Sequence, residues 1–493
     1  MSSKIIIVSN RLPVVLKRSG KQWTATPASG GLVTAMSPVM DRQGGKWIGW
    51  PGVGHSKGVA EAIQSASNDL GYKLIPTELS QSQVDGFYYG FANEILWPLL
   101  HGFETRCNFD PGHWQNYREA NALFARTAVQ NSGSRDFLWI HDYHLMLVAN
   151  QIRKAGQRRK CGFFLHIPFP PPDVFFKLPW RKEILEGLLA FDLVGFQTLR
   201  DRRNFIQCLR QMGLEELTVR GRRAVVDITL GSQKLRAGAF PISIDYQGIA
   251  ARAASEDIAS MSWLFHEKFP SRQIMIGMDR LDYTKGIPER LEAFRYALQK
   301  YPEMMEKITL VQVTVPSREK VHEYENLRAQ IEQLVGEING ELTSIGDWVP
   351  IHYIHRSFGR DDVLCMLRAA EIAIITPLRD GMNLVAKEYC ASDVNEHGVV
   401  ILSEFAGVAA EFKRRALLVN PYDREGMADA IFRAFHMGPG ERKRRMHKLR
   451  RIVRKNDIFN WTGSFLAAAG EVEQSRVQEV EDFTPDFRIN YKR

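Results

Sequence analysis

The stretch EIAIITPLRDGMNLVAKE, residues 371–388, is the part of the chain from which the fold is best predicted. Residues 372–376 form a short, β-branched apolar run, which is typical of a strand buried on both faces. Pro377 ends this run, and Gly381 permits a sharp turn. Asn383 can then cap a following helix. The stretch therefore predicts a buried strand, a tight loop and a helix.

A strand, loop and helix in this order create a site for an anion. The first backbone N–H groups of the helix, those of Met382, Asn383 and Leu384, have no partner within the helix. Asp380 in the loop and Glu388 farther along the helix supply carboxylates that accept hydrogen bonds from hydroxyl groups. Such a site suits a nucleotide sugar. The alternative is an ordinary turn whose two acids are solvated, and spacing alone does not separate the two interpretations.

Strand and helix signals alternate along most of the 493 residues. Ten apolar segments read as buried strands: 5–9, 137–141, 162–166, 193–197, 274–278, 308–315, 349–354, 372–376, 399–403 and 416–419. The clearest helix is 319–338. Alternation of this kind is typical of parallel sheets with crossover helices, and ten strands fit two sheets better than one.

The segment AFPISID, residues 239–245, is the predicted crossing between two domains. We expect an α/β protein with doubly wound domains at 1–240 and 241–460, followed by a C-terminal helix and tail at 461–493. Two such domains are expected to face a cleft at the carboxyl ends of their strands.

Polar residues follow several predicted strands: Arg11, Asp142, His166, Arg280, Lys285 and Arg318. Arg280 and Lys285, beside a glycine, suit a diphosphate, and each charge-assisted hydrogen bond contributes roughly 1.5–3 kcal/mol. A lone histidine beside an apolar run is more often a core residue, so the residues alone leave the role of His166 open.

Glycines and aromatic residues in the first third add a second candidate site. Gly30 and Gly31 precede a helical run and can hold an anion, although two adjacent glycines more often form a simple turn. Any single aromatic residue here fits a core position. Together they can form a platform for a sugar ring; these residues are Trp47, Trp50, Tyr88 and Trp97.

Composition excludes several classes of protein. Hydrophobic residues make up 44% and charged residues 25% of the chain, as in an ordinary globular protein. The five cysteines are scattered without a CxxC pair, which favours reduced thiols in a cytoplasmic protein over disulfides or zinc. No apolar stretch approaches the roughly 18 residues that span a membrane, so no membrane partner is expected.

The net charge of +9 is matched by one segment, residues 442–455, which holds nine Lys or Arg and no acid. Met446, Leu449 and Val453 recur there at helical spacing, which predicts an amphipathic helix with a solvated basic face and no nucleic-acid partner. There is no P-loop motif, so a P-loop kinase is not expected. HExxH and strand-end DxD motifs are also missing, so no metal site is expected. Residues 54–58 match GxSxG by letter, but no buried strand precedes the serine.

Nine motifs occur in order between residues 9 and 423: SNRLP, SGGL, IHDYH, LHIPFP, GFQT, MDRLDYTKG, PLRDGMNLVAKEY, LSEFAG and LVNPYD. In these the chain resembles the trehalose-6-phosphate synthases, retaining glucosyltransferases of glycosyltransferase family 20 with two Rossmann-like domains (the GT-B fold). The resemblance implies transfer of glucose from a nucleotide-glucose, UDP-glucose first among them, to glucose 6-phosphate. It also implies front-face transfer without a metal or other cofactor, and a homo-oligomer, either a dimer or a tetramer.

The resemblance assigns a role to each candidate residue. In the donor site, Arg280 and Lys285 would hold the diphosphate, with the backbone of Gly30, Gly31, Gly381, Met382, Asn383 and Leu384 around it; Glu388 would bind the ribose, Phe358 the base and Asp380 the glucose hydroxyls. In the acceptor site, Arg11, Tyr88 and Arg318 would bind the phosphate, Trp97 and Trp47 the ring, and Ile167 would select the anomer. Asp142 and His166 would lie at the reacting sugars and share catalysis with Arg280 and Lys285.

Two alternatives to this interpretation of the sequence stay open. A glucosylglycerol-phosphate synthase, using ADP-glucose and glycerol 3-phosphate, would share the donor half, and pseudoglycosyltransferases share the fold. The residues Arg11, Tyr88, Trp97 and Arg318 fit a hexose phosphate better. The alternative from another class is a catalytically silent subunit that binds sugar phosphate. The donor base is left open by the sequence.

Overall fold

The computed structural model describes residues 4–20, 22–28, 30–214, 216–221, 223–318, 322–343, 346, 348–471 and 477–483. The chain divides into two compact units. Unit 1 comprises Met1–Ile242 with Ile458–Val480, and unit 2 comprises Ser243–Asp457 with Glu481–Arg493. The predicted boundaries at 240 and 460 fall close to these two crossings. The predicted tail from 484 onward lies outside the described residues.

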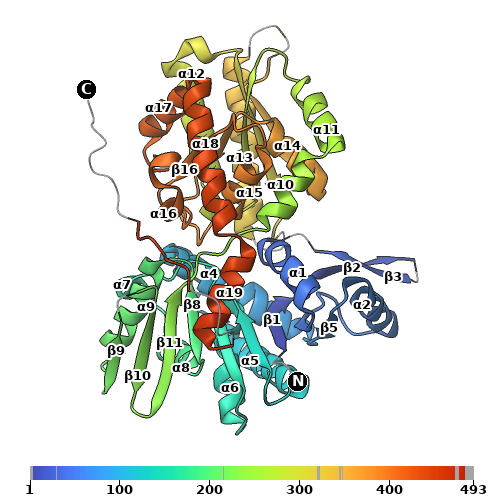
Figure 1. The fold of residues 1–493 in the computed structure, drawn as a ribbon, viewed down its shortest axis with the longest axis vertical. Helices are drawn as coiled ribbons and strands as arrows, with labels where there is room; N and C mark the ends of the chain where they lie inside the picture. The colour runs from blue at the N-terminus through green and yellow to red at the C-terminus, as the bar shows by residue number, and fades with distance from the viewer. Residues whose placement is uncertain are drawn as a thin grey trace. The chain divides into compact units, whose positions relative to one another are not determined.

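Unit 1 is built on a nine-stranded sheet of order β5-β4-β1-β6-β7-β8-β11-β10-β9 (Figure 1). Seven strands are parallel: β1 (Ile5–Arg11), β4 (Lys46–Trp50), β5 (Lys73–Pro76), β6 (Phe137–His141), β7 (Lys160–Phe164), β8 (Leu193–Phe196) and β11 (Gln233–Ala239). β10 (Val225–Leu230) and β9 (Leu217–Arg220) extend it antiparallel. β2 (Val14–Ser19) and β3 (Gln22–Pro27) form a separate hairpin.

Helices surround this sheet. They are α1 (Gly31–Gln43), α2 (Lys57–Leu70), α3 (Gln81–Gln83), the π-helix η1 (Val84–Leu96), α4 (Trp97–His101), η2 (Glu104–Arg106), α5 (Pro111–Gln130), η3 (Tyr143–Leu145), α6 (Val148–Lys154), α7 (Pro172–Phe175), α8 (Arg181–Leu189), α9 (Leu199–Gln211) and α19 (Ile458–Ala469). Ser56 caps α2 by accepting a hydrogen bond from the N–H of Val59. The serine of the GxSxG match is therefore the N-cap of α2, and its hydroxyl oxygen accepts from the helix backbone.

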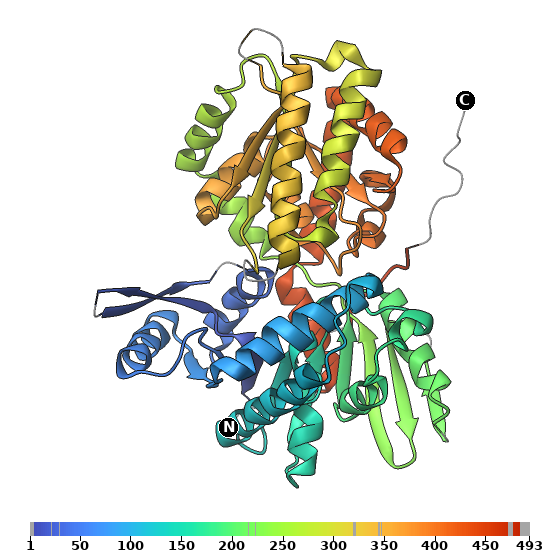
Figure 2. The ribbon, with the colours of Figure 1, turned by 180° about the vertical axis from the view of Figure 1, so that it is seen from behind.

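Unit 2 contains a six-stranded, wholly parallel sheet of order β14-β13-β12-β15-β16-β17. Its strands are β12 (Gln273–Arg280), β13 (Ile308–Val315), β14 (Ile351–His355), β15 (Ile372–Ile375), β16 (Val399–Ser403) and β17 (Leu417–Val419). The helices are α10 (Tyr246–Ala254), α11 (Glu256–His266), η4 (Tyr283–Lys285), α12 (Ile287–Lys300), η5 (Pro302–Met304), α13 (His322–Leu342), α14 (Arg360–Ala369), α15 (Leu384–Ser392), α16 (Ala409–Phe412), η6 (Lys413–Arg415), α17 (Arg424–Phe435) and α18 (Pro439–Lys455). They cover both faces of the sheet, as comparison of Figure 1 with Figure 2 shows.

Both sheets reverse their strand order at one point. Counted along the chain, the first six parallel strands of each unit lie in the order 3-2-1-4-5-6. The reversal falls between β1 and β6 in unit 1, and between β12 and β15 in unit 2. In open α/β sheets ligands bind outside the carboxyl ends of the strands at such a switch point. Each unit therefore has a defined place for a ligand.

Helix α19 belongs to unit 1, although it follows unit 2 in the sequence. Trp461 is fully buried and stacks on Trp139 at 5.0 Å, and its indole N–H donates to the carbonyl of Phe240 at 3.0 Å. Phe465 stacks on Trp139 from the same helix, at 4.5 Å. The helix predicted at 461–472 corresponds to α19, which begins at Ile458 and ends at Ala469, before Gly470 and Glu471; Val472 lies outside the described residues.

All ten predicted strands are present, but the sequence missed β4, β5 and β11 among the parallel ones. β4 has the sequence KWIGW, which lacks the continuous β-branched apolar run from which the other strands were predicted. β7 ends at Phe164, so His166 lies in the loop after the strand. The predicted helix 319–338 corresponds to α13; residues 319–321 lie outside the described residues.

Helix α18 has the predicted buried stripe of Met446, Leu449 and Val453. The expectation that its basic face is wholly solvated is wrong for Arg442, which is 7% exposed. Its guanidinium donates to backbone carbonyls, including those of Met437 and Ala434 at 2.8 Å each. Buried cations are stable where carbonyl oxygens replace water. Among the described residues no helix combines the length and apolar character needed to cross a membrane.

Candidate active site

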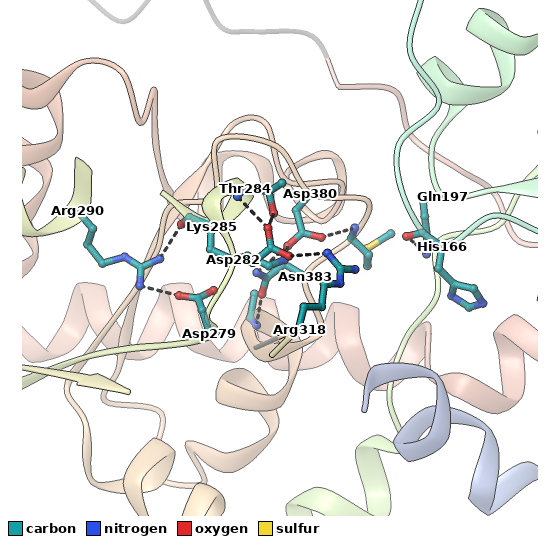
Figure 3. A network of polar contacts seen from close by, with 12 residues as sticks. His166, Gln197, Asp279, Asp282, Thr284, Lys285, Arg290, Arg318, Asp380 and Asn383 are labelled. Atoms are coloured by element: carbon teal, nitrogen blue, oxygen red, sulfur yellow. Dashed lines mark hydrogen bonds and ion pairs between the residues drawn. The ribbon is translucent and has the colours of Figure 1, made fainter. Parts of the chain in front are cut away.

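A buried carboxylate lies at the end of β12 in unit 2. Asp282 is completely buried and accepts hydrogen bonds from the N–H and hydroxyl of Thr284, at 3.0 and 2.8 Å. Tyr324 donates to it at 3.3 Å. Arg318 donates to it at 3.4 Å (Figure 3). These four donors explain how an acid is kept in the protein interior.

Asp282 also organises positive charge. Burial raises the pKa of its carboxyl, but the charges of Arg318, Arg280 and Lys285 outweigh burial, so the net pKa lies below its ordinary value. The carboxylate is therefore ionised at neutral pH, and three cations remain around it. Arg318, predicted to bind the acceptor phosphate, has a side chain only 5% exposed and a positive φ of 50°. Its guanidinium also donates to the hydroxyl of Tyr324.

The loop after β15 is tied to η4 by an ion pair. Lys285 Nζ lies 2.6 Å from Asp380 Oδ2, and both side chains are nearly buried. The amide of Asn383 donates to the same carboxylate oxygen at 3.2 Å, as Figure 3 shows. Asn383 Oδ1 accepts from the N–H of Ala386 at 3.2 Å, so the predicted helix cap is confirmed. Asn383 has a φ of 77°, a conformation that asparagine tolerates better than most residues.

The motif LSEFAG, residues 402–407, and the following Val408 form hydrogen bonds with this loop. The sequence analysis assigned the motif no role. The N–H of Asp380 donates to the carbonyl of Phe405, and that of Val408 donates to the carbonyl of Met382 at 3.0 Å. A Cβ at Gly407 would collide with the carbonyl oxygen of Gly381. Only glycine allows this close approach. The loop after β15, residues 376–383, is called the donor loop below; Lys285 holds it on one side and residues 405–408 hold it on the other.

Arg290 joins the ends of three strands beneath the cations. This fully buried guanidinium donates to Asp279 of β12 at 2.7 Å and to Gln312 of β13 at 3.0 Å. It also donates to the hydroxyl of Thr376, after β15, at 3.1 Å, and to the carbonyl of Lys285 at 3.3 Å. Figure 3 shows part of this network. Arg290 thus holds the backbone on either side of the exposed Arg280.

The two remaining donor candidates of unit 2 lie on neighbouring elements. Glu388 lies on α15 and is partly buried; burial raises the pKa of its carboxyl, with Arg360 opposing. Phe358 lies between β14 and α14, and the guanidinium of Arg356 lies over its ring at 4.5 Å.

In unit 1 an arginine and two aromatic rings meet at the end of β1. The guanidinium of Arg11 lies 4.6 Å from the ring centre of Trp50, and Tyr88 tilts against the same ring at 6.2 Å. Gly52 has a φ of 85°, and a Cβ there would overlap the Arg11 guanidinium. This glycine therefore makes room for the cation.

The prediction that Trp47 walls the acceptor ring is wrong. Trp47 is fully buried, and its indole N–H donates to the hydroxyl of Ser9 at 2.8 Å. Trp50, at the end of the same strand, is the ring that lies beside Arg11. The sequence placed Trp50 in the aromatic group without a specific role.

Trp97 and Tyr88 come from adjoining helical segments. Trp97 begins α4, is 4% exposed, and packs against Tyr143 and His101. Tyr88 lies on the π-helix η1 and stacks on His144 at 5.9 Å. π-helical segments are rare and recur at functional sites.

The predicted catalytic pair of unit 1 lies at the ends of β6 and β7. Asp142 has a φ of 75°, and its Oδ1 accepts from the N–H of His166 at 3.2 Å. Gln197 donates to the carbonyl of His166 at 3.3 Å (Figure 3). The next residue, Ile167, is 6% exposed.

Gly30 is the N-cap of α1 and is exposed, as is Gly31 at the first helical position. A Cβ on Gly30 would meet nothing within 4 Å among the described residues. Packing therefore gives no reason for a glycine at this position, whereas close approach of a ligand to the backbone would.

The residues of these clusters that were not singled out from the sequence include Asp282, Arg290 and Tyr324; the same holds for His141 at the end of β6. Asp282 and His141 lie inside motifs that the sequence analysis quoted, MDRLDYTKG and IHDYH, so motif membership was an available signal. Arg290 and Tyr324 belong to no quoted motif, and part of their hydrogen bonding depends on distant residues, namely Gln312 and Thr376 for Arg290 and Asp282 for Tyr324.

The fold and the site together define a two-domain α/β glycosyltransferase of the GT-B type. The model of glycosyltransferase family 20 matches residues 3–471. The chain is 41% identical to a trehalose-6-phosphate synthase of Mycolicibacterium gilvum, covering 95% of this chain and 94% of the relative. It is 40% identical to that of Mycolicibacterium smegmatis, covering 97% and 95%. This chain belongs to glycosyltransferase family 20.

Solved structures agree with this membership. An α,α-trehalose-phosphate synthase (UDP-forming) of Burkholderia xenovorans, in complex with glucose-6-phosphate, matches with a TM-score of 0.85 at 34% identity, over 95% of this chain and all of that chain. An E. coli structure bound with UDP-2-fluoro glucose matches with a TM-score of 0.83 at 35% identity, over 95% and 99%.

Proposed function

We propose that this protein moves glucose from UDP-glucose to glucose 6-phosphate, with retention, and forms α,α-trehalose 6-phosphate. The observation that carries the proposal is the cluster at the switch point of unit 2. There Arg280 and Lys285 lie around a buried carboxylate, beside the N-terminus of α15. A diphosphate needs such charge, and the names of the relatives indicate the same reaction.

The chemistry proposed for this cluster is front-face transfer. The bond from the anomeric carbon to the diphosphate oxygen breaks while the acceptor hydroxyl forms its new bond on the same face. The hydroxyl proton passes to the leaving diphosphate oxygen, whose growing charge is neutralised by Arg280 and Lys285. Catalysis then consists mainly of orientation and charge stabilisation, and no side chain has to attack the sugar.

The acceptor is proposed to be a hexose phosphate because of the groups at the end of β1. Arg11 supplies a cation, and Trp50 supplies the flat apolar face on which sugar rings pack. Tyr88 adds a hydroxyl beside them. Arg318 of unit 2, oriented by Asp282 and Tyr324, is proposed as a further cation for the acceptor phosphate.

The reaction is proposed to need no metal or other cofactor, since the two cations can neutralise the leaving group. Among the described residues no group of three or more His, Cys, Asp or Glu side chains could hold a metal ion. A cytoplasmic location, expected from the cysteine content, and a homo-oligomer, expected from the family resemblance, belong to the same proposal.

A product assay tests the proposal. Purified protein is incubated with UDP-, ADP- or GDP-glucose and with glucose 6-phosphate or glycerol 3-phosphate, each with and without excess EDTA. The expected product is a disaccharide phosphate that a phosphatase converts to non-reducing trehalose, formed fastest from UDP-glucose and unaffected by EDTA.

Each other outcome contradicts a specific part of the proposal. Product only with glycerol 3-phosphate would refute the acceptor assignment and leave the donor site intact. Loss of activity in EDTA that magnesium restores would reveal a metal site. Binding of sugar phosphate without turnover of any donor would identify a silent subunit.

A further inference from the structure

Two histidine rings of unit 1 are joined by a direct hydrogen bond. His141 Nδ1, at the end of β6, lies 3.0 Å from His166 Nε2 in the loop after β7. His141 is fully buried, and its ring lies 5.0 Å from that of Trp139. The family resemblance places His166 at the reacting sugars and gives His141 no role.

The surroundings of His141 decide which nitrogen carries the proton. Each neutral imidazole has one N–H, so one ring donates and the other accepts. If His166 Nε2 donated, the proton of His141 would lie on its Nε2, which is enclosed and has no hydrogen-bond partner among the described residues. If His141 Nδ1 donates, the enclosed Nε2 carries only a lone pair. Orphaned buried N–H groups are rarer than unpaired acceptors, so His141 is the donor.

We propose that His141 is a positioning residue that fixes His166 as its Nδ1–H tautomer, so that His166 offers a hydrogen-bond donor to a hydroxyl of the transferring sugar. The second half of this inference rests on the proposed function. The first half, the tautomer, concerns the free protein alone.

The charge state of the pair agrees with this arrangement. Burial lowers the pKa of His166 to about 3. Burial, followed by the neighbouring His166, lowers the pKa of His141 well below its ordinary value. Both rings are consequently neutral near pH 7. A neutral donor suits a sugar whose anomeric carbon becomes positive, because an imidazolium would repel that charge.

The backbone of His166 is held by other groups. Asp142 accepts from its N–H and Gln197 donates to its carbonyl. Phe164 packs edge-on against its ring at 4.8 Å. The contact that selects its ring proton is therefore the one with His141, and substitution of His141 changes the tautomer while the backbone stays in place.

Nitrogen NMR of the full-length protein, labelled with ¹⁵N in its imidazole rings, tests the tautomer without substrate. In both rings Nδ1 should be protonated and Nε2 should carry the lone pair, with His166→Asn and His141→Asn variants assigning the signals. A proton on His166 Nε2 would overturn the proposal, whether or not the protein transfers glucose.

Variants then test the consequence for turnover. His141→Leu removes the donor and should lower kcat tenfold or more, roughly the lower limit for loss of a transition-state donor, with KM for glucose 6-phosphate changed less than about twofold. His141→Asn can place its amide nitrogen where Nδ1 lies and should restore most of kcat.

Ile140→Val, on the opposite face of the same strand, controls for damage to the core and should keep both constants. Wild-type kcat in His141→Leu, or an equal loss in His141→Leu and His141→Asn, would refute the positioning role. If His141→Leu does not fold, the NMR result on the wild-type protein still decides the tautomer.

Discussion

At the scale of single residues, the candidate site is made of charges that are neutralised in pairs before any substrate is bound. Asp282 faces Arg318, and Asp380 faces Lys285. Such pairs keep long cationic side chains in a defined place, which lowers the ordering cost when a phosphate replaces the carboxylate as partner. Arg280 differs from these cations because it is exposed.

The first prediction concerns Arg280. Arg280→Ala should lower kcat by about a hundredfold or more, because it removes a charge that stabilises the leaving diphosphate. The free energy of unfolding should fall by no more than about 1 kcal/mol, because the side chain is exposed and Arg318 and Lys285 still face Asp282. Steady-state kinetics and urea unfolding measure the two effects.

Arg295→Ala provides the control for Arg280. Arg295 lies on α12 and pairs with Glu292 at 2.8 Å, away from the switch point. Its loss should leave kcat unchanged. A near-normal rate in purified Arg280→Ala protein would contradict the assignment.

The second prediction concerns Glu388 and pH. Burial raises the pKa of this carboxyl above its ordinary value of 4.5, so ionising it costs more in the folded than in the unfolded chain. The cost is absent below pH 4.5 and is complete once pH exceeds the folded pKa. Glu388→Gln should therefore raise the free energy of unfolding at about pH 7.5 and change it little at about pH 4. KM for UDP-glucose should rise about tenfold or more, because a charged acceptor for the ribose is lost.

Urea unfolding at the two pH values and initial rates check both halves of this prediction. Glu425→Gln, at an exposed acid on α17, is the control and should leave KM unchanged. A lower free energy of unfolding for Glu388→Gln at the higher pH would show that folding favours the ionised carboxylate, which is the opposite of the expected effect of burial.

At the scale of elements, α18 shows that a basic helix can be largely structural. Arg442 donates to the carbonyls of Met437 and Ala434, and Arg450 donates to three carbonyls at the end of α15, including that of Asp393 at 2.7 Å. These arginines donate to carbonyl groups at or just beyond the C-terminal ends of α17 and α15, where a helix leaves its last carbonyls without a full set of partners. The helix thereby fastens α15, and with it the donor loop, to unit 2.

The third prediction follows from this role. Arg442→Met should lower the free energy of unfolding by about 3 kcal/mol, because several buried carbonyls lose their donor. Lys443→Met, at the exposed neighbouring position, should change it by less than about 0.5 kcal/mol. Urea unfolding compares the two variants, and equal stability of both would contradict the structural role of Arg442.

At the scale of the whole molecule, the chain crosses from unit 1 to unit 2 and back again. The return is made by α19, whose Trp461 and Phe465 complete the core of unit 1. Unit 1 therefore cannot be completed before the last helix has been synthesised, and its stability depends on residues that follow all of the strands of unit 2.

The fourth prediction uses this dependence. Trp461→Ala should destabilise unit 1 by about 3–5 kcal/mol, the usual cost of removing a buried tryptophan. Hydrogen exchange should show lost protection in β6 and β7 and unchanged protection in β12 and β13. Phe459→Ala, at a partly buried position of the same helix, should have a smaller effect. Equal loss of protection in both units would show that they unfold as one.

Much of the fold could be predicted because its signals are local. A parallel strand buried on both faces has a short, continuously apolar sequence, and ten such strands were predicted from the sequence alone. The cap at Asn383 and the buried stripe of α18 are likewise contained within a few residues. The order of the motifs indicated the family for the same reason.

The sequence by itself thus determined ten of the strands, the helix cap at Asn383 and the charged residues at strand ends. Only the tertiary structure decided that Trp47 is a core residue and Trp50 faces Arg11, that Arg442 is buried, and that His141 meets His166. Each of these depends on which distant segment lies against the residue. Burial and hydrogen bonding are made between elements far apart in the chain, so no local pattern records them.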